Sequence, residues 1–74
     1  MKAVIDIGSN SVRLLLASGS KKEKFIKITK LAEGLNSSGR LSFSAIKRTV
    51  DAVVFFNSLA KDSAKLTVCA NVEI

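Results

Sequence analysis

Hydrophobic residues along the chain gather into short runs of strand length, separated by clusters of turn residues. Residues 3–7 and 12–17 are apolar and partly β-branched, which predicts two strands. Gly-Ser-Asn-Ser at 8–11 separates them, so the two strands are predicted to form a hairpin. A turn at 19–22 precedes a third apolar run over 24–32, whose interspersed lysines favour a position at the edge of the sheet.

The second half of the chain begins with the spacing of a helix. After a loop over 34–39, Ser42 is a suitable N-cap for a helix over 43–61. Its basic and acidic residues fall largely on one side, and its predicted apolar face contains Ile46, Val50, Val53, Phe56 or Asn57, and Ala60. Residues 65–70 predict a fourth strand, which the helical crossover makes parallel to the first.

These elements predict an α/β fold: an antiparallel three-strand meander, one helix, and a fourth strand parallel to the first. The first two strands are apolar without alternation, which is typical of strands buried on both faces. One helix covers one face, so the other face is expected to need further chain or a second copy in a homodimer. Cys69 and at least three of the four phenylalanines are expected in the core.

Composition narrows the class of protein. The chain has 74 residues, one cysteine and no histidine, so it forms one small domain at most and no internal disulfide. It has no apolar run long enough for a signal peptide or a membrane span. A soluble, cytoplasmic protein without membrane contact is therefore expected.

A net charge of +6 favours polyanionic partners, among them nucleic acid, polyphosphate, nucleotides and anionic lipid. A lysine group could form a polyanion track, although an edge hairpin kept soluble by charge is the commoner explanation. Its members are Lys21, Lys22, Lys24, Lys27 and Lys30. Nucleic acid is the least favoured partner, because no aromatic stacking platform or recognition helix is visible in the sequence.

The most informative segment is residues 6–13, DIGSNSVR. Gly8 lets the backbone approach a ligand closely, and the three polar residues Ser9, Asn10 and Ser11 offer backbone N–H groups and side-chain donors. Inward-pointing N–H groups of a turn form a nest for anions.

Charged residues lie on both sides of this turn. Asp6, at the end of the first strand, could hold Mg²⁺ through water, and Arg13 adds a positive charge. These residue types suit phosphate binding. An ordinary hairpin turn uses the same residues, so spacing alone leaves that alternative open, and a lone arginine is more often solvated or ion-paired.

Residues 6–11, followed by Arg13 and Leu14, resemble the first phosphate loop of the exopolyphosphatase/guanosine pentaphosphate phosphohydrolase family. That family is part of the actin-like, sugar-kinase and heat-shock ATPase superfamily. Residues 30–35 (KLAEGL) resemble its Arg-Leu-Gly-Glu-Gly-Leu segment, and residues 39–42 (GRLS) with the helix over 45–56 resemble its Gly-x-Leu-Ser and following helix. The chain departs from the family at Lys30, at Ala32, and after Ala70, where the family continues Thr-Ser/Ala-Ala-x-Arg.

The resemblance implies a partial ribonuclease H-like (actin-like ATPase) subdomain, with residues 1–74 as a single truncated N-terminal subdomain. In the family the second phosphate loop, the general-base glutamate and the second domain lie further along the chain. The chain is therefore expected to contain no catalytic residue and to be inactive alone.

The activity that the resemblance implies is hydrolysis of a phosphoanhydride in inorganic polyphosphate or guanosine pentaphosphate. Mg²⁺ would lie at Asp6, phosphate would bind to the turn and to Arg13, and Lys30 and Glu33 could lie near the cleft between the family's two domains. A sugar kinase is the alternative enzyme within the superfamily. The alternative outside the enzymes is a non-catalytic module that binds anions or associates with itself.

Overall fold

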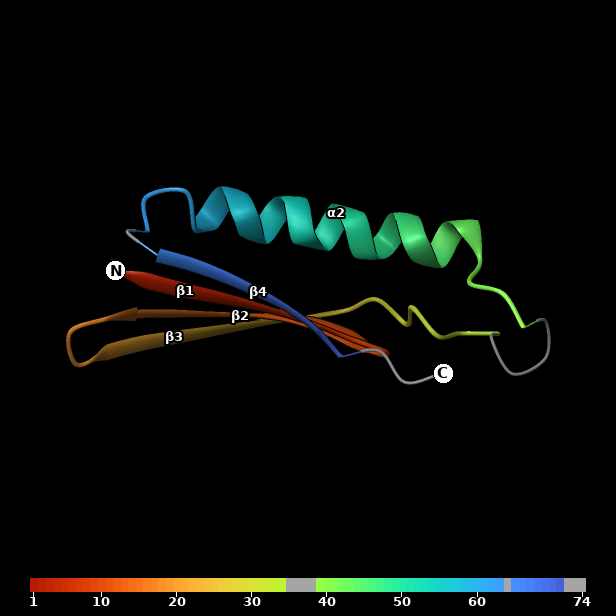
Figure 1. Ribbon diagram of the computed structural model, residues 1–74, viewed down its shortest axis with the longest axis horizontal. Helices are drawn as coiled ribbons and strands as arrows, with labels where there is room; N and C mark the ends of the chain where they lie inside the picture. Colours follow the sequence, from red (N-terminus) through yellow and green to blue (C-terminus); the bar gives the residue numbers. More distant parts are fainter. Residues whose placement is uncertain (35–38, 64, 72–74) are drawn as a thin grey trace.

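The computed structural model describes residues 1–34, 39–63 and 65–71. A sheet and a helix form two layers in an elongated molecule of 45 × 18 × 16 Å (Figure 1). The strands are β1 (Lys2–Gly8), β2 (Ser11–Ser18), β3 (Lys21–Ile28) and β4 (Lys65–Asn71), and the helix is α2 (Phe43–Leu59).

The order of the strands is β3-β2-β1-β4. β1 and β2 are antiparallel, as are β2 and β3, whereas β4 runs parallel to β1. The predicted meander, the parallel fourth strand and the position of the lysine-bearing strand at an edge are all confirmed. Leu35, the last residue of the 30–35 match, lies outside the described residues, as does most of the predicted 34–39 loop.

The predicted third strand, 24–32, is wrong at both ends. β3 begins at Lys21, because Gly19 has a φ of +60° and forms a tight turn with Ser20. It ends at Ile28, because the chain then bends back toward the β1–β2 turn, and Lys30 has a φ of +50°. A run of apolar residues does not reveal such a bend.

The predicted N-cap of the helix is confirmed. Ser42 Oγ accepts a hydrogen bond of 3.1 Å from the Ala45 N–H, so the helix begins at Phe43 as expected. The helix ends at Leu59, two residues before the predicted end, and Ala60 is its C-cap.

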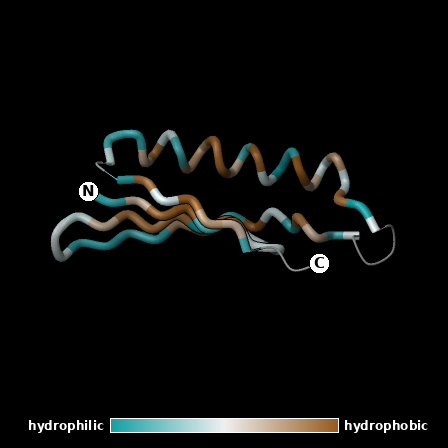
Figure 2. The backbone as a smooth tube through the Cα atoms, in the orientation of Figure 1, coloured by the Kyte–Doolittle hydropathy of each residue, from teal (hydrophilic) through white to brown (hydrophobic). Residues whose placement is uncertain are grey.

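The predicted apolar face of the helix is confirmed at Phe56, at Ala60 and at the partly buried Val53, and it is wrong at its N-terminal end. Its buried residues are Ala45, Thr49, Ala52 and Phe56, whereas Ile46 and Val50 are 40% and 52% exposed. The small alanines let the helix approach the sheet closely, and Phe56 fills the space beside them. The larger branched residues Ile46 and Val50 are therefore left exposed. Hydrophobic and hydrophilic residues alternate along the helix, as expected when only one of its sides packs on the sheet (Figure 2).

The core lies between α2 and the two central strands. Ile5 of β1 and Leu14 of β2 are adjacent in register and pack with Ala52 and Phe56. Their burial is nearly complete, which is the main contribution of a hydrophobic core to stability.

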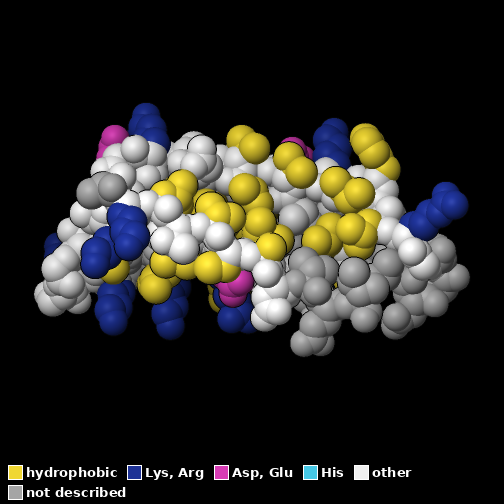
Figure 3. All heavy atoms as spheres, viewed as in Figure 1, with side chains coloured by type: hydrophobic (Ala, Val, Ile, Leu, Met, Phe, Trp, Pro, Cys, Tyr) yellow, Lys and Arg dark blue, Asp and Glu magenta, His cyan; other side chains and the backbone are white. Residues whose placement is uncertain are grey.

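Two predictions about the core are wrong. Phe43 and Phe55 are 81% and 51% exposed, Phe25 is partly buried, and Phe56 alone among the four phenylalanines is fully buried. Cys69 is exposed. α2 packs on β1 and β2 rather than on β4, so β4 remains an exposed edge strand and apolar side chains show between it and the helix (Figure 3).

The sheet face away from α2, hereafter the open face, carries Val4, Asp6, Arg13, Leu15 and Ile26. Side chains alternate along a strand, so the neighbours of the buried residues Ile5 and Leu14 point to this face. Among the described residues no element covers it. Val4 and Leu15 are half-buried and Ile26 is 62% exposed.

Candidate functional site

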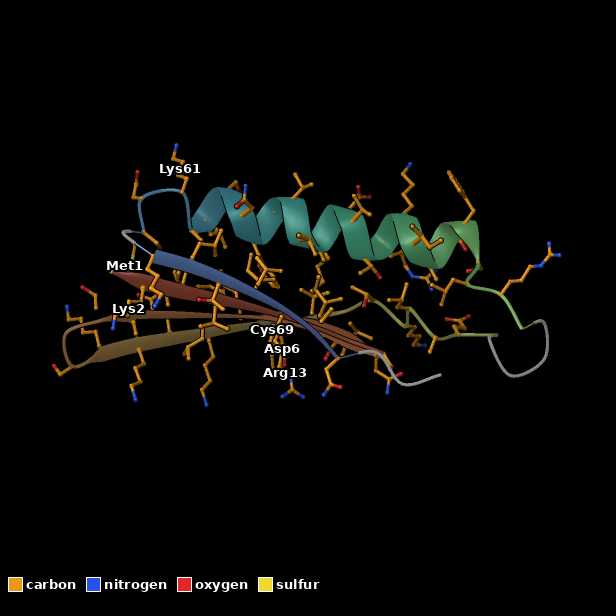
Figure 4. All side chains as sticks on the ribbon, viewed as in Figure 1. Met1, Lys2, Asp6, Arg13, Lys61 and Cys69 are labelled. Atoms are coloured by element: carbon orange, nitrogen blue, oxygen red, sulfur yellow. The ribbon has the colours of Figure 1, made fainter. Side chains whose placement is uncertain are left out.

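Asp6 and Arg13 are placed side by side by the register of the first hairpin. They are directly opposite each other on β1 and β2, and both point away from α2 (Figure 4). Asp6 is half-buried and Arg13 is exposed. Within the described residues neither is engaged in an ion pair, so a carboxylate and a guanidinium both face the space in front of the open face.

The turn between β1 and β2 completes a pocket of about 320 Å³. The residues that line it are Asp6, Gly8, Ser9, Asn10, Ser11, Arg13 and Asn71. The structure thus brings together the predicted metal residue and all five predicted phosphate-binding residues. A Cβ on Gly8 would lie 3.2 Å from the Ser11 carbonyl oxygen, so a side chain there would crowd the turn.

Asn71 is the residue of this pocket that sequence reasoning missed. It is the last residue of β4, and it pairs with Gly8 in the parallel register of β1 and β4. The signal was present, because the carboxyl ends of parallel strands meet at the same edge of a sheet, where ligands commonly bind. A predicted parallel strand ending near residue 70 therefore pointed to the next polar residue.

The backbone of the turn is held by the segment that follows β3. The N–H groups of Thr29 and Lys30 donate to the Asn10 carbonyl at 2.9 and 3.0 Å, and the Ala32 N–H donates to the Ser9 carbonyl at 3.0 Å. These bonds fix the positions of two successive carbonyls in residues 8–11, hereafter the anion loop. The loop is therefore part of the hydrogen-bonded framework rather than an isolated hairpin tip.

Lys30 and Glu33 do not line this pocket. Lys30 is exposed on the segment after β3, and Glu33 forms an ion pair with Arg48 of α2 at 3.4 Å. Their predicted position near an interdomain cleft stays a prediction, since the described residues form one wall of such a cleft at most.

The predicted lysine group is divided between two surfaces. Lys22 and Lys24 point to the open face by strand alternation, whereas Lys27 lies on the helix side with its Nζ 5.7 Å from the centre of the Phe55 ring. Neighbouring strands add Lys2, Lys65 and Arg13 to the open face. This face therefore carries a clear excess of positive charge, which only the strand register reveals.

The described residues contain no group of three or more His, Cys, Asp or Glu side chains able to hold a metal ion. Asp6 is the acidic residue that lines the pocket. Mg²⁺ commonly binds through one or two carboxylates, several waters and substrate phosphates. The pocket therefore fits a magnesium ion that arrives with its phosphate ligand, and it does not fit an all-protein metal cage.

Within the described part of the chain, no helix is long and apolar enough to cross a membrane.

No protein-family model and no curated protein matches the chain. Several solved structures match the chain. A type II variant of the Aquifex aeolicus Ppx/GppA phosphatase is 29% identical with a TM-score of 0.84, over 93% of this chain and 25% of that chain. An exopolyphosphatase-like protein is 25% identical with a TM-score of 0.80, over 93% of this chain and 23% of that chain.

An exopolyphosphatase from Cytophaga hutchinsonii, 22% identical with a TM-score of 0.69, shares the fold over 96% of this chain and 24% of its own. The chain thus spans about a quarter of the length of the structures it matches. The resemblance to the Ppx/GppA family is confirmed, as is the fold, which is a partial domain of the actin-like ATPase type.

Proposed function

We propose that the chain is the phosphate-binding N-terminal part of a phosphoanhydride hydrolase acting on inorganic polyphosphate or guanosine pentaphosphate. The proposal rests on the observation that Asp6, the Gly-Ser-Asn-Ser turn and Arg13 line a single pocket. The fold that contains this pocket is shared with Ppx/GppA phosphatases. A cytoplasmic location belongs to the same proposal, because a chain with a single cysteine does not depend on an oxidising compartment.

The pocket has the donors that a phosphate group requires. Ser9, Asn10 and Ser11 contribute the polar groups of a tight turn, and Arg13 contributes a guanidinium that can donate two parallel hydrogen bonds to phosphate oxygens. The positive open face next to the pocket raises the local concentration of polyanions. Charge and geometry therefore both favour a phosphorylated ligand over a neutral one.

Asp6 is the residue proposed to hold Mg²⁺, through a bound water. When bound there, the ion neutralises charge on phosphate oxygens as it develops during transfer. The carboxylate itself needs this partner, because without the cation it would repel the phosphate. The proposal thus predicts that Asp6 makes anion binding depend on magnesium.

Asp6→Asn is expected to abolish the magnesium dependence of pyrophosphate binding. Calorimetric titration of the wild-type chain should give tighter binding with Mg²⁺ than without, by about tenfold, the scale of one charge-assisted contact. In the variant the two titrations should coincide, because the amide no longer attracts the hydrated cation. Asp62→Asn, the same change in the exposed turn after α2, is the control. Equal magnesium dependence in both variants would exclude Asp6 as the metal residue.

The second part of the proposal is that binding is not followed by turnover in this chain. Hydrolysis needs a base that orients the attacking water, and the one acidic residue lining the pocket is assigned to the metal. We expect no phosphate release from long-chain polyphosphate above that of the Asp6→Asn variant, measured by phosphate detection. Release by the wild type that the variant lacks would contradict this part and would show a complete active site.

Self-association is the alternative function, and exposed apolar surface favours it. Ile26 is 62% exposed on the open face, and Val68 of the edge strand β4 is 54% exposed on the helix side. A homodimer through the open face would oppose two surfaces rich in lysine, so it should require salt. Sedimentation at increasing protein concentration, together with the pyrophosphate titration, distinguishes self-association from phosphate binding. A dimer that does not bind pyrophosphate supports self-association. A monomer that binds pyrophosphate supports the phosphate site.

A further inference from the structure

We propose that Arg48, a residue of α2 outside the pocket, positions the backbone of the anion loop through the segment of residues 29–33. This inference deepens the proposed function and rests on it for the identity of the ligand. Arg48 does not line the pocket, so it is a positioning residue and touches no phosphate.

Arg48 attaches the 29–33 segment to the helix. Its Nε donates to the Thr29 carbonyl at 2.9 Å, and its Nη2 lies 3.5 Å from the Lys30 carbonyl and 3.4 Å from Glu33 Oε2. The Nε bond is the short one of the three. It carries the charge of the guanidinium, so it is stronger than a bond between neutral groups.

The same peptide groups hold the anion loop. Thr29 and Lys30 share a peptide group whose oxygen accepts from Arg48 and whose N–H donates to the Asn10 carbonyl at 3.0 Å. A second bond runs from the Ala32 N–H to the Ser9 carbonyl at 3.0 Å. One peptide unit thus connects the guanidinium directly to the loop, and hydrogen bonds in such a chain polarise and strengthen one another.

Because each peptide group is planar, these hydrogen bonds also determine the directions of N–H groups in the anion loop. In a trans peptide the C=O and N–H point in opposite directions. Because the Ser9 and Asn10 carbonyls point toward the 29–33 segment, the N–H groups of Asn10 and Ser11 point away from that segment. Fixing the two carbonyls therefore fixes the directions of two backbone donors in the loop proposed to bind phosphate.

The 29–33 segment needs an external anchor because its own conformation is strained. Lys30 has a φ of +50°, a left-handed conformation that is unfavourable for a residue with a side chain. Thr29 is almost fully buried, so its carbonyl has little access to water as a substitute partner. Without Arg48 the bend is expected to open more often, and the loop carbonyls lose their partners when it does.

Arg48→Met tests this role, with Lys47→Met as the matched control. Both changes remove one positive charge from neighbouring exposed positions of α2, and both leave an aliphatic side chain in place. Arg48→Met is expected to raise the amide exchange rates of Thr29, Lys30 and Ala32 by about tenfold, and to raise the dissociation constant for magnesium pyrophosphate by a similar factor. Lys47→Met should change neither, and Arg48→Lys should give intermediate values, because a single ammonium replaces the fork of the guanidinium.

Equal exchange rates in Arg48→Met and Lys47→Met would overturn the proposal. If Arg48→Met does not fold, the Arg48→Lys comparison decides instead, since a lysine that exchanges like the wild type removes any special role for the guanidinium. The exchange measurement needs no ligand. A wild-type chain that fails to bind pyrophosphate therefore contradicts the proposed function, while the exchange rates still decide for or against Arg48.

Discussion

Replacing Arg13 with glutamate is expected to weaken binding of magnesium pyrophosphate by about 30-fold or more. The variant loses a charge-assisted contact worth roughly 2 kcal/mol, which corresponds to that factor in the dissociation constant. It also places a second carboxylate directly opposite Asp6 on the neighbouring strand, where two like charges repel each other and the phosphate. Titration calorimetry in the presence of Mg²⁺ measures the change.

Lys61→Glu is the control for net charge. It makes the same change of charge in the exposed turn beyond α2, on the opposite side of the molecule from Asp6 and Arg13 (Figure 4). Its effect should be several-fold at most and should shrink as salt is added, because the interaction is long-range and screened. If the two variants weaken binding equally, then Arg13 acts only through the overall charge of the chain, and the pocket is not the binding site.

Replacing Phe56 with alanine is expected to remove a large part of the stability of the chain. Phe56 is 2% exposed and packs against the core residues of β1 and β2, and removal of such a side chain costs about 3 to 5 kcal/mol. A chain of 74 residues has a free energy of unfolding of roughly 4 to 11 kcal/mol. One substitution thus removes a large part of that stability, and urea denaturation followed by circular dichroism should detect it.

Phe43→Ala makes the same chemical change on the same helix and serves as the reference. Phe43 is 81% exposed, so its replacement should alter the unfolding free energy by about 0.5 kcal/mol or less. Similar losses of stability in the two variants would mean that α2 does not pack on the sheet through the Ala52–Phe56 side, and the described core would be wrong.

The strands and their order could be predicted because each feature had a local cause. Short apolar runs and turn residues defined β1 and β2, lysines indicated the edge position of β3, and the helix between β3 and β4 required a parallel pairing. The N-terminal half of the buried face of α2 could not be predicted in the same way. Hydrophobicity favoured Ile46 and Val50, but close packing on a sheet favoured the smaller Ala45 and Ala52.

The site was predictable to the extent that it lies in one continuous segment. Asp6 and Arg13 meet because the hairpin fixes their register, and the turn residues lie between them. Asn71 and Arg48 act through contacts across the fold. Asn71 lines the pocket because β4 pairs in parallel with β1. Arg48 acts on the loop through the Thr29 carbonyl, which is 19 residues away in sequence. The predicted parallel strand pointed to Asn71, whereas nothing in the local sequence indicates the Arg48 contact.

The same principle explains why the lysine group does not form one continuous surface. Lys22 and Lys27 are five residues apart on one strand, and an odd separation places them on opposite faces of the sheet. Neighbouring strands instead bring Lys2 and Lys65 onto the face of Lys22. The charged surface next to the pocket is therefore a product of the register.

We propose that the β1–β2 turn binds an oxyanion together with a divalent ion. The most direct test is a titration of the ¹⁵N-labelled chain with pyrophosphate and Mg²⁺, followed amide by amide in NMR spectra. The largest shifts are expected at Gly8, Ser9, Asn10 and Ser11, with little change at the Gly19–Ser20 turn at the other end of the sheet. A well-folded sample in which every amide from Asp6 to Arg13 stays unmoved would contradict the claim.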